Sequence, residues 1–513
     1  MITQIRKKIT QILVLVIIFS FLLTDTRIWS KVYIDINAPS MKKFPIAICE
    51  LKSLSNLQDE KKSGNVVRDT LSADLDFSGF FSIVDAKKIP PQYDEEGITG
   101  QEIDFKKWAF TGAELLIKGA IIQKEDSLSV EMRLFDITQG QFVTGKRYKG
   151  KTGDLRKMAH KFANEILLKL SGTEGVFDTK IAFVSNQTGN KEIYLMDYDG
   201  FNLYRLTSNK SINLTPNWSP DGRKLIYTSF KASSPKLYLL DLTVFKETNL
   251  SVRKGLNLGG SWCRANNRIA TTLSVNGNSD IYTMSPEGDG LKRLTENFSI
   301  DVSPSWAPNG KWLAFTSSRS GTPQIYIMDS EGGSLRRLTF EGNYNASPCW
   351  SPKGDRIAFV SQQNGLFDIC VINVDGSDMK KHTNNSGNNE SPSWSPDGRF
   401  IAFSSTRTGT AKIYMMNSSC NCHWGGCATS KTVKVLLTVG GLNWGLVGLG
   451  MLLSKDLNVV YMLLGSMPTL EAIVYVLVGV AAVMKLFHCR CRKCMAACAS
   501  CTSCQVEGTG QKM

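Results

Sequence analysis

Histidine is scarce in this chain of 513 residues, which contains only four. Because imidazole is the side chain most often used for acid–base catalysis near neutral pH, this scarcity leaves little for such chemistry. The sequence also lacks a Gly-rich phosphate loop of the P-loop type and a Gly-x-Ser-x-Gly turn. These absences remove the usual marks of nucleotide hydrolases and of α/β-hydrolases. We therefore predict that the chain is not an enzyme.

Long apolar runs are missing between residues 31 and 432, so no segment there is expected to span a membrane. The net charge of +14 is diffuse, and no basic stripe is interleaved with aromatic residues. This balance does not indicate nucleic-acid binding. Cysteine is sparse between residues 31 and 417, and the few thiols there have the pattern of small buried residues. They are Cys49, Cys263, Cys349 and Cys370.

A tandem repeat is the most informative pattern that is present. Five tryptophans stand 44 residues apart. A unit of that length fits four short strands with turns, which is the blade of a β-propeller. We predict that residues 175 to 417 form one ring of blades. The five residues are Trp218, Trp262, Trp306, Trp350 and Trp394.

Each repeat combines turn chemistry with strand chemistry. Four of the tryptophans open a Trp-Ser/Ala-Pro-x-Gly segment, in which proline presets φ and glycine tolerates the left-handed region. We interpret aspartates such as Asp221 and Asp397 as turn organisers, with a place in a ligand-binding face as the alternative. The repeat that contains Trp262 lacks this turn but keeps the register. Strands are predicted after the other four turns, over Lys224–Ser229, Trp312–Ser317, Arg356–Ser361 and Phe400–Ser405.

The strand counts predict an incomplete ring. The strand that follows each turn occurs six times, whereas the tryptophan strand occurs only five times. The position 44 residues before Trp218 is Glu174, and the position 44 residues after Trp394 is Thr438, in an apolar run. Propellers close when the far end of the chain supplies the missing strand, which removes exposed edges. We expect six blades, with no innermost strand in the first and an incomplete sixth blade after Asn417.

The first 30 residues have the layout of a secretory signal peptide, because three basic residues precede the apolar run Ile12–Leu23. An uncleaved anchor is the alternative, since the cleavage site is poor. Residues 31 to 172 are predicted to form an α+β domain, with helices over Asn65–Phe77 and Leu155–Leu170 and a strand over Leu128–Phe135. His160 is interpreted as a solvated or partly packed residue of the second helix rather than as a ligand.

The carboxyl-terminal part has a different character. Residues 431 to 487 are predicted to form a two-helix transmembrane hairpin, with spans over Val433–Leu453 and Leu470–Phe487. Residues 488 to 513 form a Cys-rich tail. Five of its thiols have metal-ligand spacing, and the alternatives are palmitoylation, disordered thiols or mixed disulfides. These candidate metal ligands are Cys491, Cys494, Cys498, Cys501 and Cys504. No other cofactor is indicated.

Two topological features of the chain conflict. An export signal would place everything up to residue 432 outside the cytoplasm, yet the ends of the hairpin are rich in Lys and Arg, which prefer the cytoplasmic side. The repeat also stops abruptly after Asn417. We hypothesise that the chain is chimeric, with two reading frames joined near this residue.

The blade repeats, the Ile-Tyr-x-Met-Asp and Arg-Leu-Thr segments and the entry segment Val32–Pro39 resemble the TolB family. This resemblance covers about residues 30 to 417. It implies a periplasmic scaffold of the Gram-negative Tol-Pal system, which maintains outer-membrane integrity and envelope constriction during cell division through protein–protein contacts. It also implies that the propeller binds a Pal-like lipoprotein and that the mature amino terminus binds a TolA-like inner-membrane protein.

The implied amino-terminal contact consists of Val32, Tyr33, Ile34, Asp35 and Ile36. Their alternation fits a strand added to a partner's sheet edge, and the alternative is an edge strand of their own domain. The hairpin resembles a family of uncharacterised two-span membrane proteins and would tether the chain to the membrane through residues 433 to 487. Two alternative functions remain: a membrane-anchored ligand-binding propeller, or a chimeric chain whose Cys-rich tail binds metal.

Overall fold

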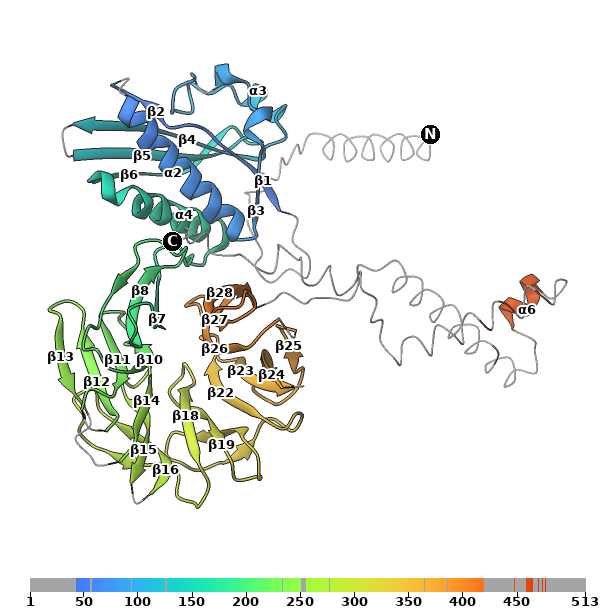
Figure 1. The fold of residues 1–513 in the computed structure, drawn as a ribbon. Coiled ribbons are helices and arrows are strands. Elements are labelled where there is room, and N and C mark those ends of the chain that lie inside the picture. Colours follow the sequence, from blue (N-terminus) through green and yellow to red (C-terminus); the bar gives the residue numbers. More distant parts are fainter. Residues whose placement is uncertain are drawn as a thin grey trace, which may run out of the picture. The chain divides into compact units, whose positions relative to one another are not determined.

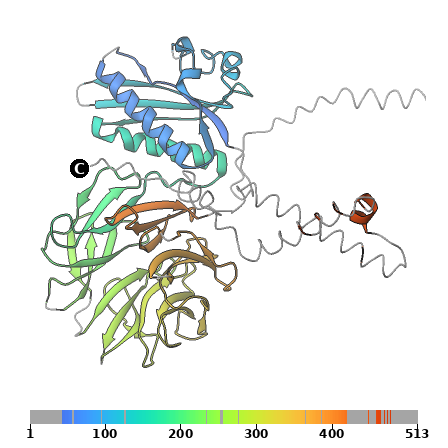
Figure 2. The same ribbon diagram turned by 45° about the vertical axis from the view of Figure 1, so that its right-hand side comes forward.

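The computed structural model divides the chain into two compact units, with the boundary between Asp178 and Thr179 (Figures 1 and 2). The boundary lies a few residues beyond the predicted end of the amino-terminal domain at residue 172. The structure describes residues 43–55, 58–93, 95–124, 127–232, 234–250, 255–275, 277–363, 365–384, 386–418, 447, 458–464, 469, 473 and 476.

The amino-terminal unit is a mixed sheet with strand order β3-β1-β4-β5-β6. Its first three strands are parallel, the last two pairings are antiparallel, and β2 adds to β4. Helices α2 and α4 lie along one face of this sheet (Figure 1). The elements are β1 (Phe44–Ile48), β2 (Lys52–Ser53), α2 (Gln58–Phe77), β3 (Phe81–Ile83), α3 (Phe105–Ala109), β4 (Leu115–Lys124), β5 (Ser127–Asp136), β6 (Gln141–Gly150) and α4 (Leu155–Ser171).

The structure confirms the two helices and the strand expected in this domain. In β5, alternate apolar side chains from Leu128 to Leu134 are buried, as a sheet covered on one face requires. Helix α2 begins at Gln58, one to two turns before the predicted start. Its polar first turns are fixed to the sheet, because the buried carboxylate of Glu60 accepts hydrogen bonds from Ser53 Oγ and from the backbone N–H of Gln123.

The second unit contains six antiparallel sheets, which Figure 1 shows arranged as the blades of a ring. The prediction of six blades is therefore confirmed. The four middle blades have four strands each: β10 (Asn213–Trp218) to β13 (Lys246–Asn249), β14 (Asn257–Trp262) to β17 (Lys292–Arg293), β18 (Asp301–Trp306) to β21 (Arg336–Arg337), and β22 (Asn345–Trp350) to β25 (Lys380–Lys381).

The inner members of these blades are β11 (Lys224–Ser229), β12 (Lys236–Asp241), β15 (Ile269–Val275), β16 (Asn278–Met284), β19 (Trp312–Ser317), β20 (Gln324–Asp329), β23 (Arg356–Gln363) and β24 (Leu366–Asn373). In the described residues the first and last blades have three strands each, as the repeat count predicted. They are β7 (Lys180–Ser185), β8 (Glu192–Asp197) and β9 (Tyr204–Arg205), and β26 (Asn389–Trp394), β27 (Phe400–Ser405) and β28 (Lys412–Asn417).

Apolar clusters between successive blades hold the ring together. Five clusters each join two consecutive blades, from the first to the sixth. Between the fourth and fifth blades, for example, Trp350 packs with Ile325 and Phe359. Each middle sheet thus buries both faces against its neighbours, which a blade cannot do alone.

The tryptophans also link the innermost strands by hydrogen bonds. The backbone N–H of Trp262, Trp306 and Trp350 donates to the residue before the tryptophan of the preceding blade. The acceptors are Asn217 Oδ1 at 3.2 Å, Ser261 Oγ at 3.1 Å and Ser305 Oγ at 2.9 Å. In the sixth blade, the indole N–H of Trp394 donates to the Cys349 carbonyl at 3.0 Å.

Most of the carboxyl-terminal part lies outside the described residues. Helix α6 (Val459–Leu464) falls between the two predicted spans. Within the part of the chain that the structure describes, no helix is both long and apolar enough to cross a bilayer. The signal peptide, the hairpin and the Cys-rich tail therefore stay predictions.

Hydrogen exchange should reveal that β7 has no innermost strand beside it among the described residues. Side chains of β7 are half-buried, whereas the equivalent positions in β11 and β19 are almost fully buried. We expect amides of β7 to exchange at least about tenfold faster than those of β11, because fewer neighbours oppose local opening. Equal protection of the two strands in a mass-spectrometric exchange experiment would contradict this expectation.

Candidate functional site

The two ends of the propeller differ in their loops. One end carries the Trp-Ser-Pro-x-Gly turns, and we name it the turn face. The other end, named the connection face, carries the loops from each blade to the next and the hairpins between second and third strands. Because successive blades repeat the same path, equivalent residues of each repeat lie at the same end of the ring.

Apolar side chains are exposed on the connection face. Ile212, Leu256 and Ile300 occupy the same repeat position, just before an innermost strand, and Ile300 is 56% exposed. Phe298 in the same loop is fully exposed, and Phe340 is 73% exposed in the next connection. Exposed apolar residues that recur along one face are typical of a protein-binding surface. The turn face carries a second exposed apolar set, which consists of Phe201, Leu203, Val244, Phe245 and Leu335.

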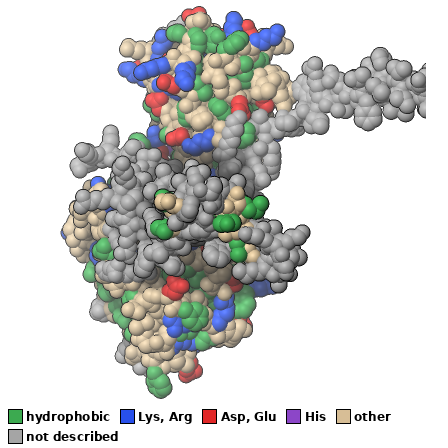
Figure 3. Space-filling model, turned by 90° about the vertical axis from the view of Figure 1, so that its right-hand side faces the viewer, with side chains coloured by type: hydrophobic (Ala, Val, Ile, Leu, Met, Phe, Trp, Pro, Cys, Tyr) green, Lys and Arg blue, Asp and Glu red, His purple; other side chains and the backbone are tan. Residues whose placement is uncertain are grey.

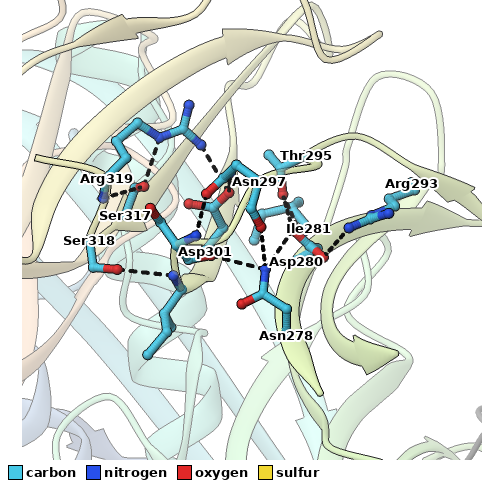
Figure 4. Close-up of polar contacts among 12 residues, drawn as sticks. Asn278, Asp280, Ile281, Arg293, Thr295, Asn297, Asp301, Ser317, Ser318 and Arg319 are labelled. Atoms are coloured by element: carbon cyan, nitrogen blue, oxygen red, sulfur yellow. Dashed lines mark hydrogen bonds and ion pairs between the residues drawn. The ribbon is translucent and has the colours of Figure 1, made fainter. Parts of the chain in front are cut away.

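Polar residues, most of them half-buried, support the loop that displays Phe298 and Ile300 (Figure 4). Asn278 Nδ2 donates to the backbone carbonyls of Asn297 and Ser299, and Asn297 Nδ2 donates to Asp301 Oδ2 at 2.8 Å. The N–H of Ile300 donates to Ser318 Oγ at 2.9 Å. These bonds fix the loop from both the third and the fourth blade.

Two buried carboxylates anchor the same network. Asp280 and Asp301 are both fully buried. Asp280 Oδ2 accepts from Arg293 Nη2 at 2.7 Å, and Asp301 Oδ2 accepts from Arg319 Nη2 at 2.9 Å. Because each buried charge has a cationic partner, the pairs are stable only while both partners are present.

Related networks occur at other junctions. The backbone N–H of an isoleucine near the start of the third strand donates to a threonine hydroxyl. That hydroxyl donates to the polar side chain of the residue just before the isoleucine. This polar side chain also accepts from the first residue of the next innermost strand. The sets are Glu192, Thr207 and Asn213; Gln324, Thr339 and Asn345; and Asp368, Thr383 and Asn389.

The turn aspartates have the structural role that we predicted. Asp221 Oδ1 accepts from Ser219 Oγ at 2.6 Å and from the N–H of Arg223 at 3.1 Å. The hydrogen bond from Ser219 lowers the pKa of the Asp221 carboxyl. Asp397 repeats this arrangement with Ser395 and Arg399.

The interpretation of His160 as solvated or partly packed is wrong. Its side chain is almost fully buried between α4 and α2, and its Nδ1 lies 2.8 Å from Asp74 Oδ2. Helical spacing alone could not show that α2 covers this face of α4.

The sparse cysteines of the two domains behave largely as expected. Cys49, Cys263 and Cys370 are buried, and Cys349 is half-buried. Burial raises the pKa of the Cys370 thiol to about 12, so this thiol stays protonated near neutral pH.

A shallow hollow of about 350 Å³ lies on β5 and β6, lined by Glu131, Arg133, Phe142, Gly145, Lys146 and Arg147. Burial alone would raise the pKa of Glu131, but hydrogen bonds from Arg147 and Arg133 outweigh it, and the pKa is lowered. On the face shown in Figure 3, cationic and anionic side chains of this domain also lie beside one another. This pairing leaves Glu131 as a charge partner rather than an acid or base.

The predicted site residues lie outside the described residues. This applies to Val32, Tyr33, Ile34, Asp35 and Ile36, and to the five cysteines from Cys491 to Cys504. Among the residues that the structure does describe, no group of three or more His, Cys, Asp or Glu side chains is placed to hold a metal. The partner-binding segment and the metal ligands therefore stay predictions.

A mixed α/β domain followed by a six-bladed propeller defines the class of this protein. The model of the TolB beta propeller domain matches residues 167–371 and 344–423, and that of the TolB amino-terminal domain matches residues 32–143. The chain therefore belongs to the TolB family. A third model, a domain of unknown function (DUF378), matches residues 428–489.

Individual relatives agree with this assignment. The chain is 41% identical over 196 residues to the Tol-Pal system protein TolB of Desulfosudis oleivorans, which is 38% of this chain and 45% of that protein. A similar alignment with the Geobacter sulfurreducens protein of the same name has 41% identity over 194 residues, 38% of this chain and 44% of that protein. The matched segment thus spans less than half the length of these relatives.

A solved structure shows the same fold over both domains. The crystal structure of TolB from Acinetobacter baumannii superposes with a TM-score of 0.64 and 27% sequence identity. The superposition covers 74% of this chain and 92% of that chain.

Removal of one buried carboxylate should destabilise the propeller. Asp301→Ala removes the carboxylate that accepts from Arg319 Nη2 and Asn297 Nδ2, and it leaves the Arg319 charge without its anionic partner. We expect a loss of about 3 kcal/mol in the free energy of unfolding. Asp221→Ala, in a largely exposed turn, is the matched control and should cost about 1 kcal/mol or less. Urea unfolding followed by tryptophan fluorescence measures both variants, and equal losses would contradict a special role for the network.

Acid should weaken the junction between the fifth and sixth blades. His382 occupies the repeat position of Leu206, Leu294 and Leu338. Burial and, secondly, the nearby charges of Arg356 and Lys380 lower the pKa of His382 from 6.5 to about 4. In the unfolded chain His382 binds a proton near pH 6.5, whereas in the folded chain it does so only near pH 4. The free energy of unfolding therefore decreases as the pH falls from about 6.5 to about 4.

The matched variant for this effect is His382→Leu, which restores the residue of the other repeats. We expect the wild type to lose about 1–2 kcal/mol more stability than this variant between pH 7 and pH 4.5. Urea midpoints at the two pH values test the expectation. Identical pH dependence in both proteins would show that His382 does not titrate in this way.

Proposed function

We propose that this chain is a non-enzymatic periplasmic scaffold of the Tol-Pal system that helps to maintain the outer membrane and to constrict the envelope at division. The observation that carries this proposal is the row of exposed apolar side chains on rigid loops of the connection face, in a chain of the TolB family. A rigid display of apolar groups lowers the conformational cost of binding a protein partner.

We assign the Pal-like lipoprotein to the connection face. Phe298 and Ile300 project from a loop that the half-buried Asn278 and Asn297 and the buried Asp301 hold in place. Large apolar side chains at the centre of a contact contribute most of its binding energy. The TolA-like protein is assigned to Val32–Ile36 on the resemblance alone.

A binding assay with the periplasmic domain of a Pal-like lipoprotein tests this assignment. Ile300→Asp should weaken binding at least about tenfold, which corresponds to about 1.4 kcal/mol. Val244→Asp is the matched control, because Val244 is 68% exposed in a turn-face loop, and its affinity should be unchanged. Equal effects of the two variants would reject the connection face, and a failure of the wild type to bind would reject the function.

A further inference from the structure

The inner edge of the first blade has no partner strand among the described residues. Strand β7 pairs with β8 on one side only, whereas the equivalent strands β11, β15, β19, β23 and β27 each pair with an innermost strand as well. We propose that β7 accepts a β-strand from a second polypeptide, one that carries the small residue–Pro–x–Trp pattern of an innermost strand. This proposal is independent of the Pal assignment.

The five complete pairings define the register of the incoming strand. In four of the five pairings the tryptophan lies opposite the second residue of the neighbouring strand, as Trp218 does opposite Leu225 and Trp394 opposite Ile401. In the third blade, Trp262 lies opposite Ile269, the first residue of β15. The corresponding residue of β7 is Ile181. The Asn or Asp that begins an innermost strand lies opposite a serine in four of the five pairings, as Asn213 does opposite Ser229, whereas Asn257 lies opposite Leu273. The counterpart of the serine in β7 is Ser185.

The hydrogen bonds between the tryptophan strands of successive blades also indicate a place for one more strand, between the sixth blade and the first. In the inner blades, the residue before each tryptophan accepts a hydrogen bond from the next blade. Ser393 holds this position in the sixth blade and is exposed, whereas its equivalent Ser305 is buried. An incoming tryptophan N–H would complete the series at Ser393, and the residue before it would accept from Trp218.

A second polypeptide is the source that we propose, because each Pro-x-Trp segment in the printed residues is already in use. Each Pro-x-Trp segment of this protein already forms an innermost strand, in β10, β18, β22 and β26. Beyond Trp394 the remaining tryptophans are Trp424 and Trp444, and neither follows a Pro-x pair. A second copy of this chain would use its own segments in the same way. Strand addition satisfies the open backbone groups of β7, and the tryptophan supplies specificity.

The test uses the full chain in a mild detergent and a fluorescent peptide with the sequence of residues 387 to 398, which includes the innermost strand of the sixth blade. Fluorescence anisotropy should show saturable binding, and hydrogen exchange of β7 should slow when the peptide is bound. A peptide in which the residue equivalent to Trp394 is alanine should bind at least about tenfold more weakly.

Protein variants locate the binding edge. Ile181→Asp should abolish binding, because it places a charge opposite the tryptophan. Tyr204→Asp, at an exposed position in the outermost strand of the same blade, is the matched control and should bind like the wild type. The proposal is overturned if the folded chain does not bind the peptide, as would happen if its own remaining residues cover β7. It is also overturned if Ile181→Asp binds normally.

Discussion

A propeller blade cannot bury its own two apolar faces, and this constraint governs the rest of the second domain. Each of the five apolar clusters described in the propeller lies between two blades rather than within one, as for Trp350 between the fourth and fifth. A blade is therefore stable only through its neighbours, and the sheets form a ring. Apolar burial alone does not fix how neighbouring blades are aligned. The hydrogen bonds from the tryptophan N–H groups between innermost strands supply this alignment.

Buried polar residues turn this repetitive scaffold into a specific surface. The apolar clusters would tolerate many loop conformations, but the Asp280 and Asp301 pairs leave buried charges unpaired if the connection moves. The loop that carries Phe298 and Ile300 is therefore held from two blades at once. Rigid support beneath exposed apolar groups is what a docking protein requires.

Much of the propeller could be predicted because its repeat is strict. The tryptophan spacing gave the repeat length, and the six copies of the strand that follows predicted six blades. The mismatch at Glu174 correctly indicated that the first blade has no innermost strand among the described residues. The polar networks were missed because residues such as Thr295 and Asp301 have no distinctive local pattern. Comparison of Thr207, Thr295, Thr339 and Thr383 across repeats contains the signal that could have revealed them. The interpretation of His160 was wrong for another reason, because helical periodicity does not show which helix covers which face.

The hairpins between the second and third strands differ in the length of their strand pairing, although every repeat has the same number of residues. In the third and fifth blades, β15–β16 and β23–β24 extend their pairing until only a short turn remains, whereas β11–β12 end in an open loop. The extra pairing uses hairpin residues, so the circumference of the ring is unaffected. Two of the six blades, the third and the fifth, thus carry a longer paired hairpin at this end. This end of the ring is therefore not sixfold symmetric. A partner that binds here can distinguish one rotational orientation from the others.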